Sequence, residues 1–328
     1  ISKTVLNALT HVRNFISAGA FVSANGLIVP TGGDYSAIFP KGGGKGVFGI
    51  AKGMSMQRLK GKIDPYHMNM VQRGTRVGVS GGTNIHVGEY ARSAEDLLAA
   101  RANVFIDPAL AESKANRSLL QLKERLRKGF NIFQDMYVEE DNFWKNGNWL
   151  LERNRFDTAF RNLGVNETNF KEALKGKGVS KELRNFLNDS VERFYDKSTG
   201  TFNGNYELFL DEVGGKLTRN NVPNYAYVGR FGRALRLSPL GNFIAFPMEI
   251  MRTGSNIIDQ SIKEMTSGIP EIVKLGQKRF TSFALTVGAV PQVARETFKA
   301  MHNVSNEEME ALRRVVPEWS KNSTLIPT

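Results

Sequence analysis

The sequence contains no cysteine among its 328 residues. This absence excludes disulfides, cysteine-ligated metal sites and thiol nucleophiles, and it suits a protein that cannot rely on one redox compartment. Long apolar runs are also missing, because the two most apolar stretches, 15–30 and 280–293, are shorter than the ~18–20 residues that span a bilayer. We therefore expect neither a disulfide scaffold nor a constitutive membrane span.

Acidic residues are scarce in the first 88 residues, which contain ten Lys or Arg but only Asp34 and Asp64. This region holds a charge of 10 − 2 = +8, out of +12 for the whole chain. Clustered cations repel one another unless an anion lies nearby, so polyanions are the favoured partners. We predict sequence-independent contact with double-stranded DNA or another anion through Lys41, Lys45, Lys52, Arg58, Lys60, Lys62, Arg73 and Arg76.

Few aromatic side chains that could stack on bases lie among these basic residues. Only Phe39, Phe48 and Tyr66 are candidates for stacking on single strands. Contacts to phosphates position a protein on nucleic acid without reading its sequence, so we do not predict specific base recognition.

Glycine is concentrated in the same region, with sixteen of the 32 glycines between Gly19 and Gly88. Because glycine costs about 1 kcal/mol in a helix interior, this density predicts a loop-rich or extended segment. Gly44, Gly46 and Gly49 have the spacing of a dinucleotide-binding loop. Such a loop needs a strand before it and a helix after it, and the pattern predicts neither, so we interpret it as a flexible loop.

Periodic apolar positions dominate from Ser93 onward and predict helices. N-cap patterns begin at Ser93, Asp107 and Ser305, the last with Glu308 three residues later. The fold class predicted is mainly α: an irregular, glycine-rich, basic N-terminal region followed by a multi-helix array, divided at 1–92, 93–238 and 239–328. Helices are expected near 3–24, 94–106, 108–128, 130–152, 168–175, 181–197, 205–213, 222–237, 243–266, 270–287, 291–302 and 306–315.

No residue pattern indicates catalysis, a metal or a cofactor. The four histidines are scattered without ligand spacing. Glu139, Glu140 and Asp141 form the densest carboxylate run, which could serve glycoside cleavage. Helical spacing lets Asp141 reach Lys145, so we favour a surface or interface face, and we expect a protein that is not an enzyme.

Several apolar residues are predicted to pack in a core or an interface. In 15–29, small residues separate large ones, a pattern that allows close helix contacts in a protein bundle or in lipid. The segment 239–250, "PLGNFIAFPMEI", is predicted to be buried. The predicted packing residues are Phe15, Ile16, Phe21, Trp144, Phe243, Phe246 and Met248.

Three stretches carry a joint resemblance: "SKTVLNALTHVRNFISAGAFVSANG" at 2–26, "QDMYVEEDNFWKNGNWLLERNRF" at 134–156 and "VPNYAYVGRFGRALRLSPLGNFIAFPMEIMRTGSNII" at 222–258. In this order they resemble segments of the very large internal virion proteins of short-tailed bacteriophages, the ejection or inner-core proteins that are delivered with the genome. The resemblance is weaker over 157–221 and after about 290.

The resemblance implies a helical piece of a giant polypeptide that forms a homo-oligomeric ring at the portal vertex inside the capsid. The implied partners are other core or portal proteins and double-stranded DNA, and after ejection the host cell envelope, where the protein helps to form a conduit for DNA. The chain opens on Ile1 and is interpreted as a piece of something longer. Two alternatives stay open: a membrane-active or nucleic-acid-binding module, and a fragment whose peptidoglycan-cleaving or RNA polymerase domain lies elsewhere.

Overall fold

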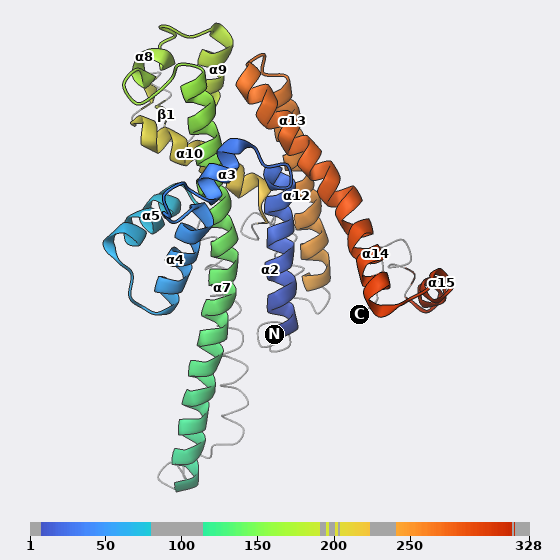
Figure 1. Cartoon of the computed structure of the whole chain (residues 1–328). Helices are drawn as coiled ribbons and strands as arrows, with labels where there is room; N and C mark the ends of the chain where they lie inside the picture. Colours follow the sequence, from blue (N-terminus) through green and yellow to red (C-terminus); the bar gives the residue numbers. More distant parts are fainter. Residues whose placement is uncertain are drawn as a thin grey trace.

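The computed structural model describes residues 8–79, 114–190, 195–196, 201–202, 204–223, 241–316 and 318. These residues are mainly helical, which confirms the predicted fold class (Figure 1). The described β structure is one short antiparallel pairing of β1 (Tyr195–Asp196) with β2 (Thr201–Phe202). The helices are α2 (Ala8–Val22), α3 (Gly32–Ile38), α4 (Val47–Leu59), α5 (Pro65–Arg76), α7 (Lys114–Asn162), α8 (Phe170–Leu174), α9 (Lys181–Asp189), α10 (Tyr206–Asn221), α12 (Gly241–Met265), α13 (Pro270–Ala284), α14 (Val290–His302) and α15 (Asn306–Val315), with π-helical turns η1 (Ser23–Leu27) and η4 (Leu285–Ala289).

The long helix α7 organises the fold. Its 49 residues correspond to a length of about 74 Å at 1.5 Å per residue, and α2, α3, α4 and α10 pack against it (Figure 1). Two helices were predicted here, at 108–128 and 130–152, divided near Gly129. That division is wrong, because one glycine weakens a helix by about 1 kcal/mol without removing a backbone hydrogen bond.

The prediction that the glycine-rich N-terminal region is loop-rich or extended is wrong for much of 32–76, where α3, α4 and α5 form. Tertiary packing overrides the low helix propensity here. A Cβ added to Gly53 in α4 would lie 2.3 Å from the His67 Nε2, and one added to Gly147 in α7 would lie 2.5 Å from the Phe48 ring. These glycines let helices approach closely, and the loops 39–46 and 60–64 keep the predicted irregular character.

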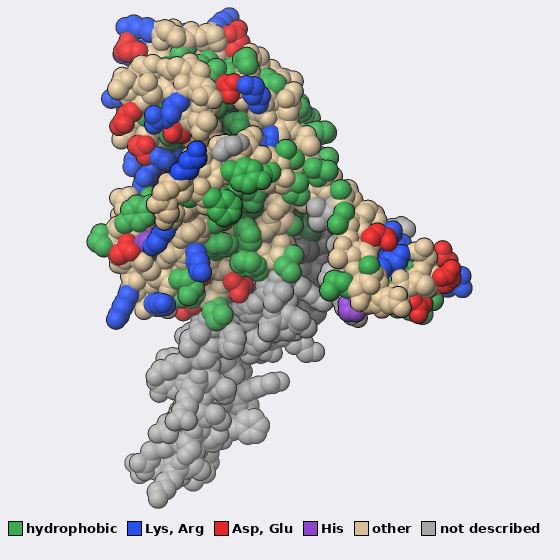
Figure 2. All heavy atoms as spheres, in the orientation of Figure 1, with side chains coloured by type: hydrophobic (Ala, Val, Ile, Leu, Met, Phe, Trp, Pro, Cys, Tyr) green, Lys and Arg blue, Asp and Glu red, His purple; other side chains and the backbone are tan. Residues whose placement is uncertain are grey.

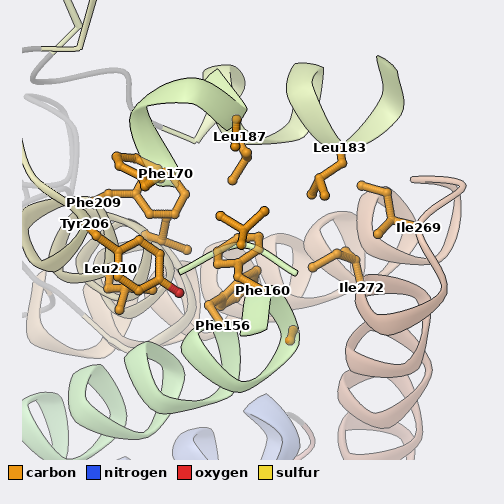
Figure 3. Packing of buried hydrophobic residues seen from close by; sticks show 14 of the residues in the cluster. Phe156, Phe160, Phe170, Leu183, Leu187, Tyr206, Phe209, Leu210, Ile269 and Ile272 are labelled. Carbon is orange, nitrogen blue, oxygen red and sulfur yellow. The ribbon is translucent and has the colours of Figure 1, made fainter. Parts of the chain in front are cut away.

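The larger hydrophobic core lies at the end of α7 and joins it to α8, α9, α10 and the start of α13 (Figure 3). Phe160 and Phe209 pack with ring centroids 5.4 Å apart, and Phe170 lies 4.7 Å from Phe209. A second core joins α4 and α5 to the C-terminal half of α7 around the fully buried Trp149. The two cores pack against successive stretches of α7, Trp149 to Leu151 and Phe156 to Phe160.

Tyr206 gives a pH-dependent prediction. Its hydroxyl donates a hydrogen bond of 3.0 Å to the Asp157 carboxylate, and burial together with this negative charge raises the pKa of Tyr206. Because the folded pKa lies above the unfolded value of ~10, the stabilisation is complete below about pH 10 and is lost as the pH rises further. We expect Tyr206→Phe to cost about 1 kcal/mol at neutral pH and to make the alkaline loss of stability smaller than in the wild type. Urea unfolding on both sides of this window measures it, and identical alkaline slopes would contradict the assignment.

Several predicted helix ends agree with the structure. Pro270 is the first residue of α13, and Ser305 and Glu308 form a capping box at α15. The helix predicted over 205–213 is longer, and the one predicted over 181–197 ends at Asp189, with β1 formed at Tyr195–Asp196. The predictions over 94–106 and 222–237, and the boundaries at 92/93 and 238/239, lie outside the described residues.

Candidate functional site

Five of the predicted anion contacts form an exposed set on α4 and its flanking loops. We call Lys41, Lys45, Lys52, Lys60 and Lys62 the lysine surface; all five are exposed. None of them has an ion-pair partner among the residues that the structure describes. Lys and Arg side chains lie along the outer edge of the α4–α5 region (Figure 2).

The two acids of this region do not neutralise the lysine surface. The Asp34 carboxylate is fully buried. Asp64 accepts hydrogen bonds from the Gln57 side chain at 2.7 Å and from the His67 backbone at 2.8 Å. These bonds, with the His67 backbone bond first, hold the pKa of Asp64 far below its usual value. Asp34 pairs with Arg155 and Lys278, and Asp64 pairs with His67, so neither carboxylate forms an ion pair with the five ammonium groups, which are left for an external anion.

The three predicted arginine contacts are placed differently. Arg58 forms an ion pair of 3.0 Å with Glu139 in α7. Arg73 binds Asp211 at 2.7 Å and Glu207 at 3.0 Å, both in α10, and its hydrogen bonds to Asp211 raise the Arg73 pKa. Arg76 is exposed but also has an interaction within the protein. The sequence predicted that Arg58 and Arg73 lack acidic partners, because the acids that pair with them lie over 80 residues away along the chain.

A buried charge network lies where η1, α3, α7, α12 and α13 meet. Its members are Asp34, Glu152, Arg155, Glu264, Lys278 and Arg279, all buried, three acids and three bases. Arg279 Nη2 donates to Glu152 at 2.9 Å and its Nε donates to Glu264 at 3.1 Å. Arg155 Nε donates to Asp34 at 2.8 Å, and the Lys278 Nζ contacts the same carboxylate.

The backbone of η1 is held by the same guanidinium groups. Gly26 has φ +105°, in the left-handed region that favours glycine, and this breaks α2. The carbonyls at this break accept hydrogen bonds from Arg155, which donates to Asn25 O at 2.9 Å and to Gly26 O at 2.8 Å. Asn148 and Asn221 complete the shell around the Asn25 side chain. The network therefore fixes the direction in which the chain leaves α2.

Burial and the charges within the network both shift the pKa values of its members. Burial would raise the pKa of Glu152, but Arg279 and Arg155 outweigh this effect and lower it. Burial raises the pKa of Glu264 against the opposing effect of Arg279. For Lys278, burial and Arg279 lower the pKa, whereas contact with Asp34 favours the charged form. Every one of these groups is paired inside the protein, so the arrangement acts as a structural clamp.

The predicted packing residues fall into two groups. Phe15 and Trp144 belong to an aromatic cluster with Phe48 and Phe143, in which Phe15 and Trp144 have centroids 5.1 Å apart. A Cβ added to Gly19 would lie 2.8 Å from Trp144, so this glycine permits the contact of α2 with α7. Phe21 is half-buried, whereas Phe15 and Ile16 are 40% and 64% exposed and so are not core residues; the use of Ile16 in an interface stays a prediction.

The segment 239–250 was predicted to be buried in a core or an interface, and its described apolar side chains do not lie in the core of the chain. Met248 is 43% exposed and Ile250 is exposed, while Glu249 between them is buried against Arg252. Phe243 and Phe246 lie outside the residues whose side chains the structure describes. The use of Met248 in an interface stays a prediction.

The three acids of the carboxylate run in α7 each interact with other residues of the chain. Asp141 binds Lys145 at 2.5 Å, as its helical spacing predicted. Glu139 is buried, not on the surface, and burial raises its pKa despite the nearby Arg58. Glu140 also has an interaction within the protein. Among the described residues, no group of His, Asp or Glu side chains is arranged to hold a metal ion.

Comparisons with known proteins do not add to this geometry. No protein-family model matches the chain, and no curated protein or solved structure matches it. No helix in the described part of the chain has the length and apolar character needed to cross a membrane.

Proposed function

We propose that the chain is a structural protein of a phage virion core that contacts double-stranded DNA through the lysine surface and assembles with copies of itself. The observation that carries the DNA contact is the lysine surface, five exposed ammonium groups without intrachain ion-pair partners among the described residues. Flexible exposed lysines bind phosphates as point charges and do not read bases. A conduit or core protein in contact with DNA needs this sequence-independent contact.

The resemblance to internal virion proteins supports the same proposal. Two of its three segments, 2–26 and 134–156, meet at the buried charge network, where Asn25 comes from the first and Asn148, Glu152 and Arg155 from the second. The segments are therefore linked in space as well as by their order in the sequence. We propose location inside the capsid at the portal vertex, and in the host cell envelope after ejection.

Replacing the five residues of the lysine surface by Gln is expected to weaken duplex DNA binding and to flatten its salt dependence. Each lost phosphate contact reduces the slope of log K against log salt by about 0.9, so the full set accounts for a change of up to about 4.5. Fluorescence anisotropy with a labelled duplex over a salt series measures this slope.

The matched control replaces five exposed lysines outside the lysine surface by Gln, which changes the net charge equally: Lys171, Lys177, Lys181, Lys263 and Lys274. The control variant should keep most of the wild-type slope. Equal slopes for both variants would mean that only net charge matters, and an unchanged slope in the first variant would remove the DNA role.

A further inference from the structure

From Met248 onward, where the structure describes its side chains, α12 has the reverse polarity of an ordinary surface helix. An amphipathic helix buries its apolar face and exposes its polar one. The buried face of α12 instead presents mainly polar side chains, namely Glu249, Thr253, Ile257, Ser261 and Glu264. This polarity is required on the inside, because Glu264 binds Arg279 and Glu249 binds Arg252.

The outer face of α12 carries a mainly apolar stripe. Met251 is 71% exposed, Met248 43% and Ile262 48%, Ser255 is exposed and Ile258 is half-buried. We call these five residues the α12 stripe. Their spacing along the chain is 3, 4, 3 and 4 residues, which is the a and d pattern of a coiled coil over two heptads.

The stripe cannot be buried by rotating α12 within its own chain. Such a rotation would expose the Glu264–Arg279 pair and bring Met251 into a charged interior, at the cost of unpaired buried charges. A Cβ added to Gly276 of α13 would lie 2.7 Å from the Ser261 carbonyl and from the Met265 amide. This close backbone contact fixes the face that α12 turns toward α13, so the part of the chain that the structure describes leaves the stripe uncovered.

The spacing and the surroundings of the stripe favour a helix over lipid as its cover. A heptad seam fits side chains of a second helix, whereas lipid imposes no such period. From Met248 to Ile262 the stripe extends for about 21 Å, at 1.5 Å per residue, which is shorter than the ~30 Å of a bilayer core. The Asp259–Lys263 ion pair beside it, with both side chains more than 60% exposed, suits the polar rim of a protein interface.

We infer that the α12 stripe packs against the α12 stripe of a second copy of this chain. The stripe has no charged residue, so two copies can meet there without like-charge repulsion despite the net charge of +12. The flanking charges compensate each other, since Lys263 lies 2.7 Å from Asp259. This inference rests on the proposed self-association and names the surface that mediates it. Two heptads make a short seam, so we expect reversible association that one substitution can disrupt.

The test compares Met251→Glu with Ile250→Glu by sedimentation velocity over a concentration series. Both variants place the same charge at adjacent exposed positions of α12, but position 250 lies on a different face of the helix from the stripe. Met251→Glu should raise the apparent dissociation constant of self-association at least about tenfold, and Ile250→Glu should leave it near the wild-type value. Circular dichroism and thermal unfolding establish that both variants are folded.

Cysteine cross-linking gives a second readout in a chain that has no native cysteine. Ser255→Cys places one thiol in the stripe, and Ile250→Cys places one off it. A short bis-maleimide should link Ser255→Cys into covalent dimers and leave Ile250→Cys largely monomeric. Equal cross-linking of both variants would contradict pairing through the stripe.

The outcomes separate the inference from the proposed function. Self-association that survives Met251→Glu keeps the assembly proposal and overturns the α12 pairing. A wild-type chain that stays monomeric at all concentrations overturns both. A monomeric chain that binds phosphatidylcholine–phosphatidylglycerol vesicles, and loses that binding in Met251→Glu but not in Ile250→Glu, identifies the stripe as a lipid-contacting face and overturns the second copy as its cover.

Discussion

Arg279→Met is expected to lower the free energy of unfolding by about 3–5 kcal/mol, the range found when one partner of a buried ion pair is removed. The Arg279 guanidinium binds Glu152 and Glu264, both buried, and also donates to the Asn25 carbonyl at 3.2 Å. Its loss leaves Glu152 with Arg155 and Asn25 as donors and Glu264 with the neutral Gln260, and it removes one restraint on η1. Met fills much of the volume of the Arg side chain, so the change in stability comes mainly from the lost charge and not from a cavity.

Urea unfolding followed by circular dichroism measures this change, with Lys274→Met as the matched control. Lys274 lies on the same helix in an exposed ion pair with Glu271, and its removal should change stability by less than about 0.5 kcal/mol. Adding Glu264→Gln to Arg279→Met should recover part of the loss, since it removes one unpaired buried charge. Equal stability of Arg279→Met and Lys274→Met would show that the network does not clamp the fold.

Gly276→Ala is the second substitution with a large expected effect, a loss of about 1–3 kcal/mol from overpacking. The added Cβ would lie 2.7 Å from both the Ser261 carbonyl oxygen and the Met265 amide nitrogen. Both neighbours are backbone atoms of α12, which cannot rotate away as a side chain can. The helices would have to separate, and Arg279, three residues further along α13, would be drawn away from Glu264.

Gly288→Ala is the control for this substitution. A Cβ at Gly288 meets no atom within 4 Å, so Ala there should be neutral or stabilising by up to about 1 kcal/mol through its higher helix propensity. Thermal and urea unfolding of the two variants compare them directly. A Gly276→Ala protein as stable as the wild type would contradict the close packing of α12 on α13.

Local signals in the sequence predicted much of the helical structure correctly. The capping box from Ser305 to Glu308 and Pro270 at a first helical position are such signals, because they act within a few residues of the helix start. The five lysines singled out from the scarcity of nearby acids are exposed, while their contact with an anion stays a prediction. Glycine density was misleading, since Gly53 and Gly74 lie within helices and face side chains of other helices at close range, His67 and Trp149.

The sequence by itself determined the helical class, the absence of disulfides and the excess of positive charge near the N-terminus, because these depend on composition and short-range spacing. Only the tertiary structure decided that Arg58 and Arg73 are paired, that Glu264 and Arg279 lie inside, and that Met251 lies outside. Each of these outcomes depends on a partner brought close by folding. An ion pair or a close backbone contact between helices determines which face of a helix turns inward, and apolar periodicity on one helix does not contain that information.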